Sequence, residues 1–276
     1  MEMNTPTSPK TSMHAAAIAH VEPILRMQAL DKVYPNGTRA LAGLHLDVAP
    51  GEFVSLLGPS GCGKSTALRI AAGLSAQTAG RIVRPGEDEA EGTSPRPGDI
   101  AFVFQDPNLM PWATVFDNVL LPFTLAGVHR REAQPQVAAI LDTVGLGKFQ
   151  NAYPRELSGG MKMRVSIARA LVTRPRLLLM DEPFAALDEI TRNKLSQDLL
   201  ELWKETNSTV IFVTHSVFES VYLSSRIVVM AARPGRIIGE IAIDRPYPRS
   251  GDFRLSDEYS ACCRQVSALL GRAMES

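Results

Sequence analysis

Residues 58–66 read Gly58-Pro59-Ser60-Gly61-Cys62-Gly63-Lys64-Ser65-Thr66, which matches the pattern G-x-x-x-x-G-K-S. The apolar segment 53–57 precedes them, and a helical segment at 67–72 with a capping Gly73 follows. A strand before this pattern and a helix after it form the setting in which it binds nucleotide phosphates. The pattern therefore predicts a phosphate-binding loop in an α/β core, against the alternative of a chance glycine-rich turn.

Each residue type in this loop has a physical reason. Glycines allow backbone N–H groups to converge on phosphate oxygens without obstruction by Cβ atoms. The N-terminus of the following helix adds about half a positive charge where the anion lies. Lys64 can reach the β- and γ-phosphates of ATP, and the Ser65 hydroxyl can ligate Mg²⁺. We therefore expect residues 58–66 to bind ATP and Ser65 to bind the metal.

Two neighbouring carboxylates follow a second apolar segment at 177–180, which ends in Asp181-Glu182-Pro183. In P-loop NTPases an apolar strand ending in Asp holds Mg²⁺ opposite the phosphate loop, so Asp181 is a candidate metal ligand. Glu182 would then lie beside the γ-phosphate, where it can orient and polarise the attacking water. On its own, Asp-Glu-Pro could simply end a strand, but the loop at 58–66 favours the catalytic interpretation.

The remainder of the chain alternates short β-branched segments with helical ones, which favours an α/β fold with a largely parallel sheet. Residues 25–33 and 40–48 surround a Pro-Asn-Gly turn and predict an antiparallel β subdomain. From about 107 to 174 the pattern is helical, which predicts an α-helical subdomain inserted into a P-loop NTPase core. Buried strands are expected at 53–57, 100–104, 177–180, 210–214, 227–230 and 237–243.

The predicted organisation has three parts. Residues 1–23, rich in Thr, Ser, Pro and Ala, are expected to form a disordered N-terminal tail. Residues 24–245 form the main domain, with a surface loop at 84–99 that is rich in Pro, Gly and acidic residues. Residues 246–276 form a C-terminal extension, partly helical at 257–272.

The segment Leu157-Ser158-Gly159-Gly160-Met161 provides a second helix start suited to an anion. Ser158 can cap a helix running from about residue 159 to 172, and the two glycines leave its N-terminus open to phosphate. One chain thus contains two phosphate-binding helix starts, the second just before the strand that ends in Asp181. This combination resembles the ABC ATPase family over nearly all of residues 25–243.

The resemblance implies a RecA-like core and a dimer in which Ser158, Gly159 and Gly160 of one subunit meet ATP on the loop of the other. Tyr34 is similar to the aromatic residue that stacks on adenine. Gln105 is similar to the glutamine that links Mg²⁺ to the membrane partner, and His215 to the histidine that contacts the γ-phosphate. Glu182, His215 and Gln105 are therefore the candidate catalytic residues, and Ser65, Gln105 and Asp181 the candidate metal ligands.

These positions also have simpler interpretations. Tyr34 could be an aromatic residue at the rim of a hairpin, while Gln105 and His215 could be polar residues at strand ends. Residues 185–188 resemble the D-loop of the family, yet Asp188 could also cap the helix that begins near residue 191. The chain departs from the family pattern at two positions: Met161, which ends the segment 157–161, and Ser216, which follows the histidine. Neither departure removes a phosphate contact.

Residues 109–115, 161–165 and 232–237 resemble one branch of the family, the ATPases of nitrate, sulfonate, taurine and bicarbonate importers. This resemblance implies an integral membrane permease and an extracytoplasmic solute-binding protein as partners, with the chain at the cytoplasmic face of the inner membrane. The expected solute is a small anion, such as a sulfonate. An exporter, a lipid-transport system and a soluble ABC ATPase remain open, because they share the catalytic residues.

In the family, the segment after Gln105 forms the groove for a coupling helix of the permease. Four apolar side chains follow this glutamine and could line that groove or belong to the core of the helical subdomain: Leu109, Met110, Trp112 and Phe116.

Composition adds two expectations. Lys plus Arg equals Asp plus Glu, 29 against 29 in 276 residues, so no overall field attracts nucleic acid and no nucleic-acid partner is expected. The three cysteines, Cys62, Cys262 and Cys263, have no metal-ligand spacing and favour a reduced protein. Because Cys62 lies within the phosphate-binding loop, we expect a bulky thiol reagent attached there to obstruct ATP.

Overall fold

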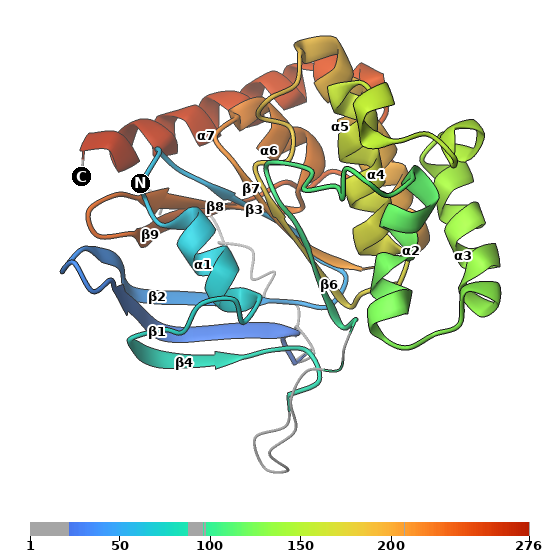
Figure 1. Cartoon of the computed structure of the whole chain (residues 1–276). Coiled ribbons are helices and arrows are strands. Elements are labelled where there is room, and N and C mark those ends of the chain that lie inside the picture. Colours follow the sequence, from blue (N-terminus) through green and yellow to red (C-terminus); the bar gives the residue numbers. More distant parts are fainter. Residues whose placement is uncertain (1–21, 88–95, 97, 207, 276) are drawn as a thin grey trace, which may run out of the picture.

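The structure is a computed structural model that describes residues 22–87, 96, 98–206 and 208–275. It contains two β-sheets with helices packed around them (Figure 1). The smaller sheet is antiparallel and has the order β2-β1-β4, formed by β1 Leu25–Val33, β2 Arg39–Val48 and β4 Ala79–Val83. The larger sheet has the order β5-β6-β7-β3-β8-β9, with β5 Ile100–Val103, β6 Leu177–Asp181, β7 Thr209–Thr214, β3 Phe53–Leu57, β8 Arg226–Ala231 and β9 Arg236–Ala242.

The order of the larger sheet determines where a ligand can bind. Strands β5, β6, β7, β3 and β8 are parallel, and β9 runs antiparallel to β8. Strands β6, β7 and β3 are neighbours, so the residues that follow Met180, Val213 and Leu57 emerge side by side at one edge. Ligands of open α/β sheets bind at the carboxyl ends of such strands.

The sheet has an apolar layer on each face, which explains why its strands consist of continuous apolar residues. Successive side chains of β3 alternate between the layers: Val54 and Leu56 face one, while Phe53 and Leu57 face the other. The first layer is covered by α1, Lys64–Ala71, and by the antiparallel sheet (Figure 1). The second is covered by α4, α5, α6 and α7, with bounds Gly159–Leu171, Glu189–Thr206, Val217–Leu223 and Asp257–Glu275.

Between β5 and β6 the chain forms a helical block that projects from the edge of the sheet (Figure 1). Residues 107–174 are all described and include no strand. Thr114, His129 and Ser158 cap the three α-helices by accepting a hydrogen bond from a backbone N–H of the first turn. The helical segments are α2 Val115–Leu125, α3 Arg130–Thr143, η1 Gly147–Phe149, η2 Pro154–Glu156 and α4.

The C-terminal residues pack onto the core. Helix α7 follows a short 3₁₀ segment, η3 Gly251–Leu255, and lies against α6, β8 and β9. Arg249, only 3% exposed, donates hydrogen bonds to the carbonyl groups of Val221, Tyr222 and Ser224 at the end of α6, each at 2.9 Å. A cation at the C-terminal end of a helix is electrostatically favourable. The connection after β9 is therefore fixed to the helix that follows His215.

The expected strands agree with the observed ones to within one residue at each end, but β4 was not predicted. Its sequence is Ala-Gly-Arg-Ile-Val, and only Ile82 is buried, so the strand lacks an apolar pattern. The expected tail at 1–23 and loop at 84–99 lie largely outside the described residues.

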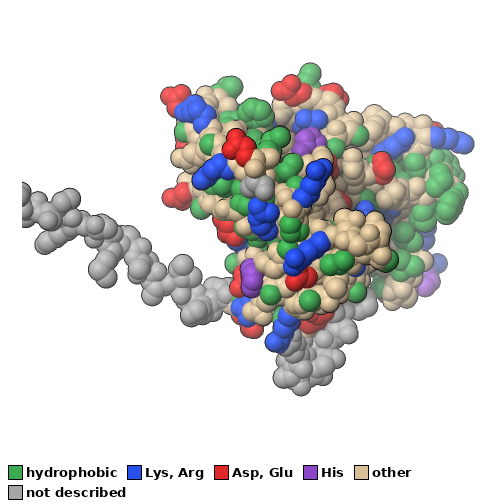
Figure 2. Space-filling view, turned by 90° about the vertical axis from the view of Figure 1, so that its left-hand side faces the viewer, with side chains coloured by type: hydrophobic (Ala, Val, Ile, Leu, Met, Phe, Trp, Pro, Cys, Tyr) green, Lys and Arg blue, Asp and Glu red, His purple; other side chains and the backbone are tan. Residues whose placement is uncertain are grey.

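Two surface features bear on binding partners. On the face shown in Figure 2, positive and negative side chains are interspersed, as the equal numbers of acidic and basic residues suggest. Within the described ranges, none of the helices is long and apolar enough to span a bilayer.

Candidate nucleotide-binding site

The loop after β3 has the backbone geometry that its glycines predict. Gly61 and Gly63 adopt φ angles of +77° and +91°, in the left-handed region that favours glycine. A Cβ atom on Gly63 would lie 2.7 Å from the carbonyl oxygen of Ala40, so a larger residue would also clash. Gly63 precedes helix α1 and provides no side-chain cap, which leaves the first N–H groups of this helix free to bind an anion.

Lys64 is a buried cation in the middle of this loop, with only 4% of its surface exposed. Its Nζ donates hydrogen bonds to the carbonyl oxygens of Gly58 at 2.7 Å and Pro59 at 3.0 Å. The loop thus folds around the ammonium group and holds it where phosphate is expected. Phosphate oxygens are stronger acceptors for an ammonium than neutral carbonyl groups are.

Ser65 and Asp181 bring a hydroxyl group and a carboxylate together. The Ser65 hydroxyl donates to Asp181 Oδ1 at 2.7 Å, although 116 residues separate them in the sequence. Asp181 is 8% exposed, and this burial raises the pKa of its carboxyl group, against the opposing effect of the Ser65 hydrogen bond. Two such oxygen atoms suit Mg²⁺, which prefers oxygen ligands and keeps several waters. Among the described residues, no group of three or more His, Cys, Asp and Glu side chains forms a metal site.

Glu182 and His215 meet at the ends of β6 and β7. Glu182 Oε2 lies 3.2 Å from His215 Nδ1, and the side chains are 23% and 56% exposed. Glu182 also adopts a φ of +47°, which is uncommon for a residue with a Cβ atom. Its N–H donates to the carbonyl oxygen of Val213, and this bond fixes the turn. The side chain is thereby directed into the cavity next to the loop.

This cavity has a volume of about 420 Å³. At its rim, the Tyr34 hydroxyl lies 3.2 Å from Thr66 Oγ1, and Lys32 Nζ lies 5.2 Å from the centre of the Tyr34 ring. The cavity is lined by Tyr34, Thr38, Arg39, Ala40, Ser60, Gly61, Gly63, Lys64, Ser65, Thr66, Glu182 and Arg233. Thr38, Arg39, Ala40 and Arg233 were not predicted as site residues, because only the folded chain brings their hairpin and turn to the phosphate-binding loop.

Other expected residues do not line this cavity. Gln105 is exposed, and Ser158, Gly159 and Gly160 lie at the start of α4. Ser158 Oγ accepts a hydrogen bond from the N–H of Met161 at 3.3 Å, as expected of a cap. A Cβ atom on Gly160 would lie 2.7 Å from Thr191, so this glycine permits close contact between α4 and α5.

Two expectations are corrected or refined. Cys62 is fully buried, and this burial raises the pKa of its thiol, so we expect a bulky thiol reagent to attach to it only slowly in the folded chain. Asp188 Oδ1 accepts a hydrogen bond from the N–H of Thr191 at 3.0 Å and therefore caps α5.

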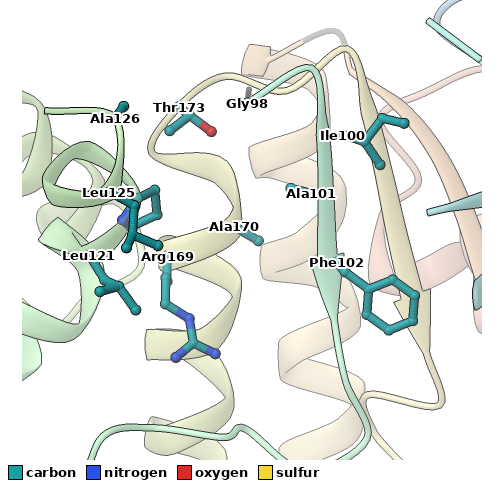
Figure 3. A pocket seen from close by; sticks show the side chains of 11 residues that line it. Gly98, Ile100, Ala101, Phe102, Leu121, Leu125, Ala126, Arg169, Ala170 and Thr173 are labelled. Carbon is teal, nitrogen blue, oxygen red and sulfur yellow. The ribbon is translucent and has the colours of Figure 1, made fainter. Parts of the chain in front are cut away.

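A second, larger cavity of about 620 Å³ lies between the edge strand β5 and the helical block (Figure 3). It is lined by Gly98, Ile100, Ala101, Phe102, Leu121, Pro122, Leu125, Ala126, Arg169, Ala170 and Thr173. Leu125 is 79% exposed at its rim. We call this cavity the apolar groove.

None of the four apolar residues that follow Gln105 lines the apolar groove. They divide between the two alternatives: Phe116 is buried in the core, whereas Trp112 is 76% exposed. Leu109 and Met110 are partly buried. The groove is built from the first three residues of β5 and the C-terminal ends of α2 and α4.

Comparison with known proteins agrees with this geometry. The family model described as ABC transporter matches residues 41–185. The aliphatic sulfonates import ATP-binding protein SsuB of Bacillus licheniformis is 44% identical over 229 residues, which cover 82% of this chain and 87% of that protein. The taurine import ATP-binding protein TauB of Rhizobium johnstonii is 42% identical over 243 residues, which cover 86% of this chain and 91% of that protein.

A solved structure extends the similarity to the fold. The dimeric ATP-binding cassette MJ0796, in a post-hydrolysis state with ADP and Pi, superimposes with a TM-score of 0.69 and is 34% identical. The match covers 81% of this chain and 100% of that one. The two-sheet architecture and the phosphate-binding loop are thus those of an ATP-binding cassette, and this chain belongs to the ABC transporter ATP-binding family.

Proposed function

We propose that this chain hydrolyses Mg·ATP to drive a membrane permease that imports a small anionic solute of the sulfonate type. The observation that carries the proposal is the single cavity in which Lys64, Ser65 and Glu182 meet. These residues supply a cation for the phosphates, a hydroxyl group backed by the Asp181 carboxylate, and a carboxylate that can act on water.

The loop residues bind the triphosphate in this proposal. N–H groups at the start of α1, which has no side-chain cap, would bind phosphate oxygens, and the ammonium group of Lys64 would exchange a carbonyl partner for a phosphate oxygen. Tyr34, at the rim, is placed to stack on the adenine ring. Stacking on an aromatic side chain requires no particular hydrogen-bond pattern from the base.

Ser65 and Asp181 are the residues that would hold Mg²⁺. When bound, the ion would neutralise charge on the phosphates. Ser65 and Asp181 already lie within hydrogen-bonding distance, so the two ligands are brought together before the ion arrives. The side chain of Gln105 is exposed and does not line the cavity. We therefore assign Gln105 to the same site from the family resemblance alone.

Glu182 is proposed to orient and polarise the water that attacks the γ-phosphate. The strained turn after β6 directs its carboxylate into the cavity, and the contact with His215 restrains it from the other side. His215 is more exposed than Glu182 and so remains available to contact the γ-phosphate. Together these residues place a base and a donor at the open end of the phosphate loop.

A second copy of the chain is proposed to complete the site. Ser158, Gly159 and Gly160 begin a helix suited to phosphate but do not line the cavity of their own chain. Two helix starts can hold one γ-phosphate from opposite sides when they belong to different subunits. The dimeric state of the related cassette MJ0796 supports this arrangement.

The apolar groove is proposed as the docking site for a helix of the permease. Exposed apolar side chains beside a groove favour binding of an amphipathic helix. Arg169 connects this groove with the segment after Gln105, because its guanidinium group donates to the carbonyl oxygens of Pro107 and Asn108 at 2.8 Å each. Docking would place the chain at the cytoplasmic face of the membrane. The relatives' names, which describe import of sulfonates and taurine, support an importer. An extracytoplasmic solute-binding protein is proposed from the family resemblance alone.

We also propose that residues 24–245 form the ATPase domain. The helical part at about 107–174 is proposed as its α-helical subdomain. The C-terminal extension would stay fixed to α6 through Arg249 and to β8 and β9 through α7.

Purification of the chain followed by a phosphate-release assay tests the proposal. We expect Mg²⁺-dependent hydrolysis of ATP that ceases when the metal is chelated. Affinity purification from membranes would then identify the partner. Recovery of a permease of a sulfonate-type importer supports the proposal, whereas recovery of an exporter or of no membrane protein would contradict the importer assignment.

A further inference from the structure

The mechanism leaves one buried carboxylate without a role. Glu219, which is 7% exposed, lies in the first turn of α6. It contacts residues 214–216, which we call the His215 loop. Thr214 Oγ1 donates to Glu219 Oε2 at 2.5 Å, and Ser216 Oγ accepts the Glu219 N–H at 3.3 Å. The residues on both sides of His215 are therefore bonded to Glu219.

The loop is closed by one more hydrogen bond. The N–H of Ser216 donates to Thr214 Oγ1 at 3.0 Å, so this hydroxyl accepts from one side of His215 and donates to Glu219. A hydroxyl group that both donates and accepts fixes two partners at once. The backbone on either side of His215 is thus held in one arrangement.

The other oxygen of Glu219 faces an arginine on a different helix. Glu219 Oε1 lies 3.3 Å from Arg192 Nε on α5. Arg192 Nη2 donates to the carbonyl oxygen of Leu187 at 2.8 Å, within residues 185–188. One arginine therefore contacts both the carboxylate behind His215 and the loop that leads into α5, and α5 and α6 lie side by side (Figure 1).

Burial of the Glu219 carboxylate, beside an arginine whose side chain is 29% exposed, has an energetic cost. Desolvation raises the pKa of Glu219, while the Thr214 hydrogen bond and the charge of Arg192 act in the opposite direction. Buried ion pairs of this kind often add little to stability, and the better-supported reason to retain them is a specific arrangement of the groups they join. A role in geometry therefore fits the pair better than a role in stability.

We propose that Glu219 and Arg192 are positioning residues that join the His215 loop to residues 185–188 and hold His215 against Glu182. Only the expected effect on kcat depends on the proposed function. Because Arg192 is bonded to residues 185–188, a shift of that segment would move Arg192, then Glu219, and so the histidine.

The chain contains a matched control for this pair. Arg226 on β8 bonds to Glu52 at 2.6 and 2.9 Å, and the two side chains are 21% and 17% exposed. Glu52 precedes β3, at the end of the sheet opposite to the nucleotide cavity. Glu52→Gln therefore removes a partly buried carboxylate from an ion pair without touching the His215 loop.

The experiment compares Glu219→Gln, Arg192→Lys and Glu52→Gln. In the first two we expect kcat to fall between about 10- and 100-fold, because small displacements of a catalytic group have effects of this size. We expect the Kd for ATP to change by less than about threefold, since neither residue lines the nucleotide cavity. Glu52→Gln should leave kcat within about twofold, whatever its effect on melting temperature.

A double-mutant cycle tests whether Glu219 acts through His215. In a His215→Ala background, Glu219→Gln should change kcat by less than about twofold, because the residue it positions is absent. Effects that multiply in the double variant would overturn the inference. So would a normal kcat in Glu219→Gln when the unmodified chain hydrolyses ATP.

A readout that does not need activity separates this inference from the proposed function. The imidazole NMR signals of His215, assigned by their loss in His215→Ala, should shift in Glu219→Gln and Arg192→Lys but not in Glu52→Gln. If the chain hydrolyses no ATP, the proposed function fails and these spectra still decide the inference. Unchanged His215 signals in both variants would refute it.

Discussion

The nucleotide cavity and the apolar groove lie at two edges of the same sheet, yet they are built differently. Half of the residues that line the nucleotide cavity belong to one continuous loop, and the others come from the β1–β2 hairpin and from the turns after β6 and β8. The groove is formed by side chains of β5, α2 and α4, and Arg169 is its one charged lining residue. The difference matches the ligands proposed for the two regions. A phosphate group is bound by N–H groups held in fixed positions, whereas an amphipathic helix is bound through complementary apolar surface.

The two regions are also joined differently to the remainder of the chain. In the nucleotide cavity, Ser65 and Asp181 connect one side to the other by a direct side-chain hydrogen bond. In the groove, Arg169 bonds to the backbone of Pro107 and Asn108, and Asn108 has a φ of +46°. Arg169 thus joins the groove to a left-handed backbone turn that lies three residues after Gln105.

The largest expected effect concerns the nucleotide cavity. Glu182→Gln should keep ATP binding but lower turnover by about 10²- to 10⁴-fold, because an amide cannot accept the proton of the attacking water. The variant should also accumulate as an ATP-bound dimer, since hydrolysis normally reopens the site. Steady-state phosphate release and light scattering with ATP measure the two outcomes.

The matched control for this variant is Glu201→Gln. Glu201 is an exposed glutamate on α5 whose carboxylate accepts only a long hydrogen bond from Gln197, at 3.4 Å. The Glu201→Gln variant should leave turnover unchanged. Equal turnover in Glu182→Gln and Glu201→Gln would remove Glu182 from the mechanism.

The second effect tests the charge held by the loop. Lys64→Met keeps the length of the side chain but removes the ammonium group, so ATP should bind about 10- to 100-fold more weakly, as expected for lost hydrogen bonds to a charged group. Titration with a fluorescent ATP analogue measures the affinity. Lys148→Met, at an exposed lysine in η1, is the control and should bind normally. Normal affinity in both variants would contradict the assignment of Lys64.

The contrast between the two regions also explains what the sequence could predict. The continuous motif at 58–66 and the apolar strand before Asp181 predicted the core sheet and most of the cavity, because short-range geometry determines them. Arg233 was missed because tertiary packing alone brings its turn to the loop. The apolar groove was not predicted, because distance along the chain from Gln105 does not reveal which side of α2 faces β5.

The same limit applies inside the helical block and behind the cavity. Phe116 and Trp112 are four residues apart and equally apolar, yet the first is 7% exposed and the second 76%. The Glu219–Arg192 pair gave no motif, since a carboxylate and an arginine 27 residues apart, from 192 to 219, reveal nothing until two helices pack together.

The third effect tests completion of the cavity by a second copy. Ser158→Arg should leave ATP binding to one chain within about twofold, because this residue lies outside the cavity. In a Glu182→Gln background, the added bulk and charge should weaken the ATP-dependent dimer by about tenfold or more through steric exclusion. Light scattering across a range of protein concentrations measures the association.

A control for added arginine is Thr143→Arg at the exposed end of α3. This variant should still form the ATP-dependent dimer. If Ser158→Arg dimerises as well as Thr143→Arg, the start of helix α4 does not face the partner, and the proposed two-subunit site is wrong.

The smallest expected effect on catalysis is the sharpest test of the groove. Leu125 is 79% exposed, so Leu125→Ser removes little buried surface and should change the melting temperature by less than about 2 °C. ATP hydrolysis by the purified chain should stay within about twofold, because the nucleotide cavity is unaffected. Recovery of the membrane partner should fall clearly, since the variant replaces an apolar anchor at the rim of the docking site with a hydroxyl. Leu255→Ser, at an equally exposed leucine in η3 that does not line the groove, separates a local effect from a general loss of apolar surface. If the two serine variants retain the partner equally well, the apolar groove is not where the permease binds. If Leu125→Ser also stops basal hydrolysis, the apolar groove and the nucleotide cavity are not independent of each other.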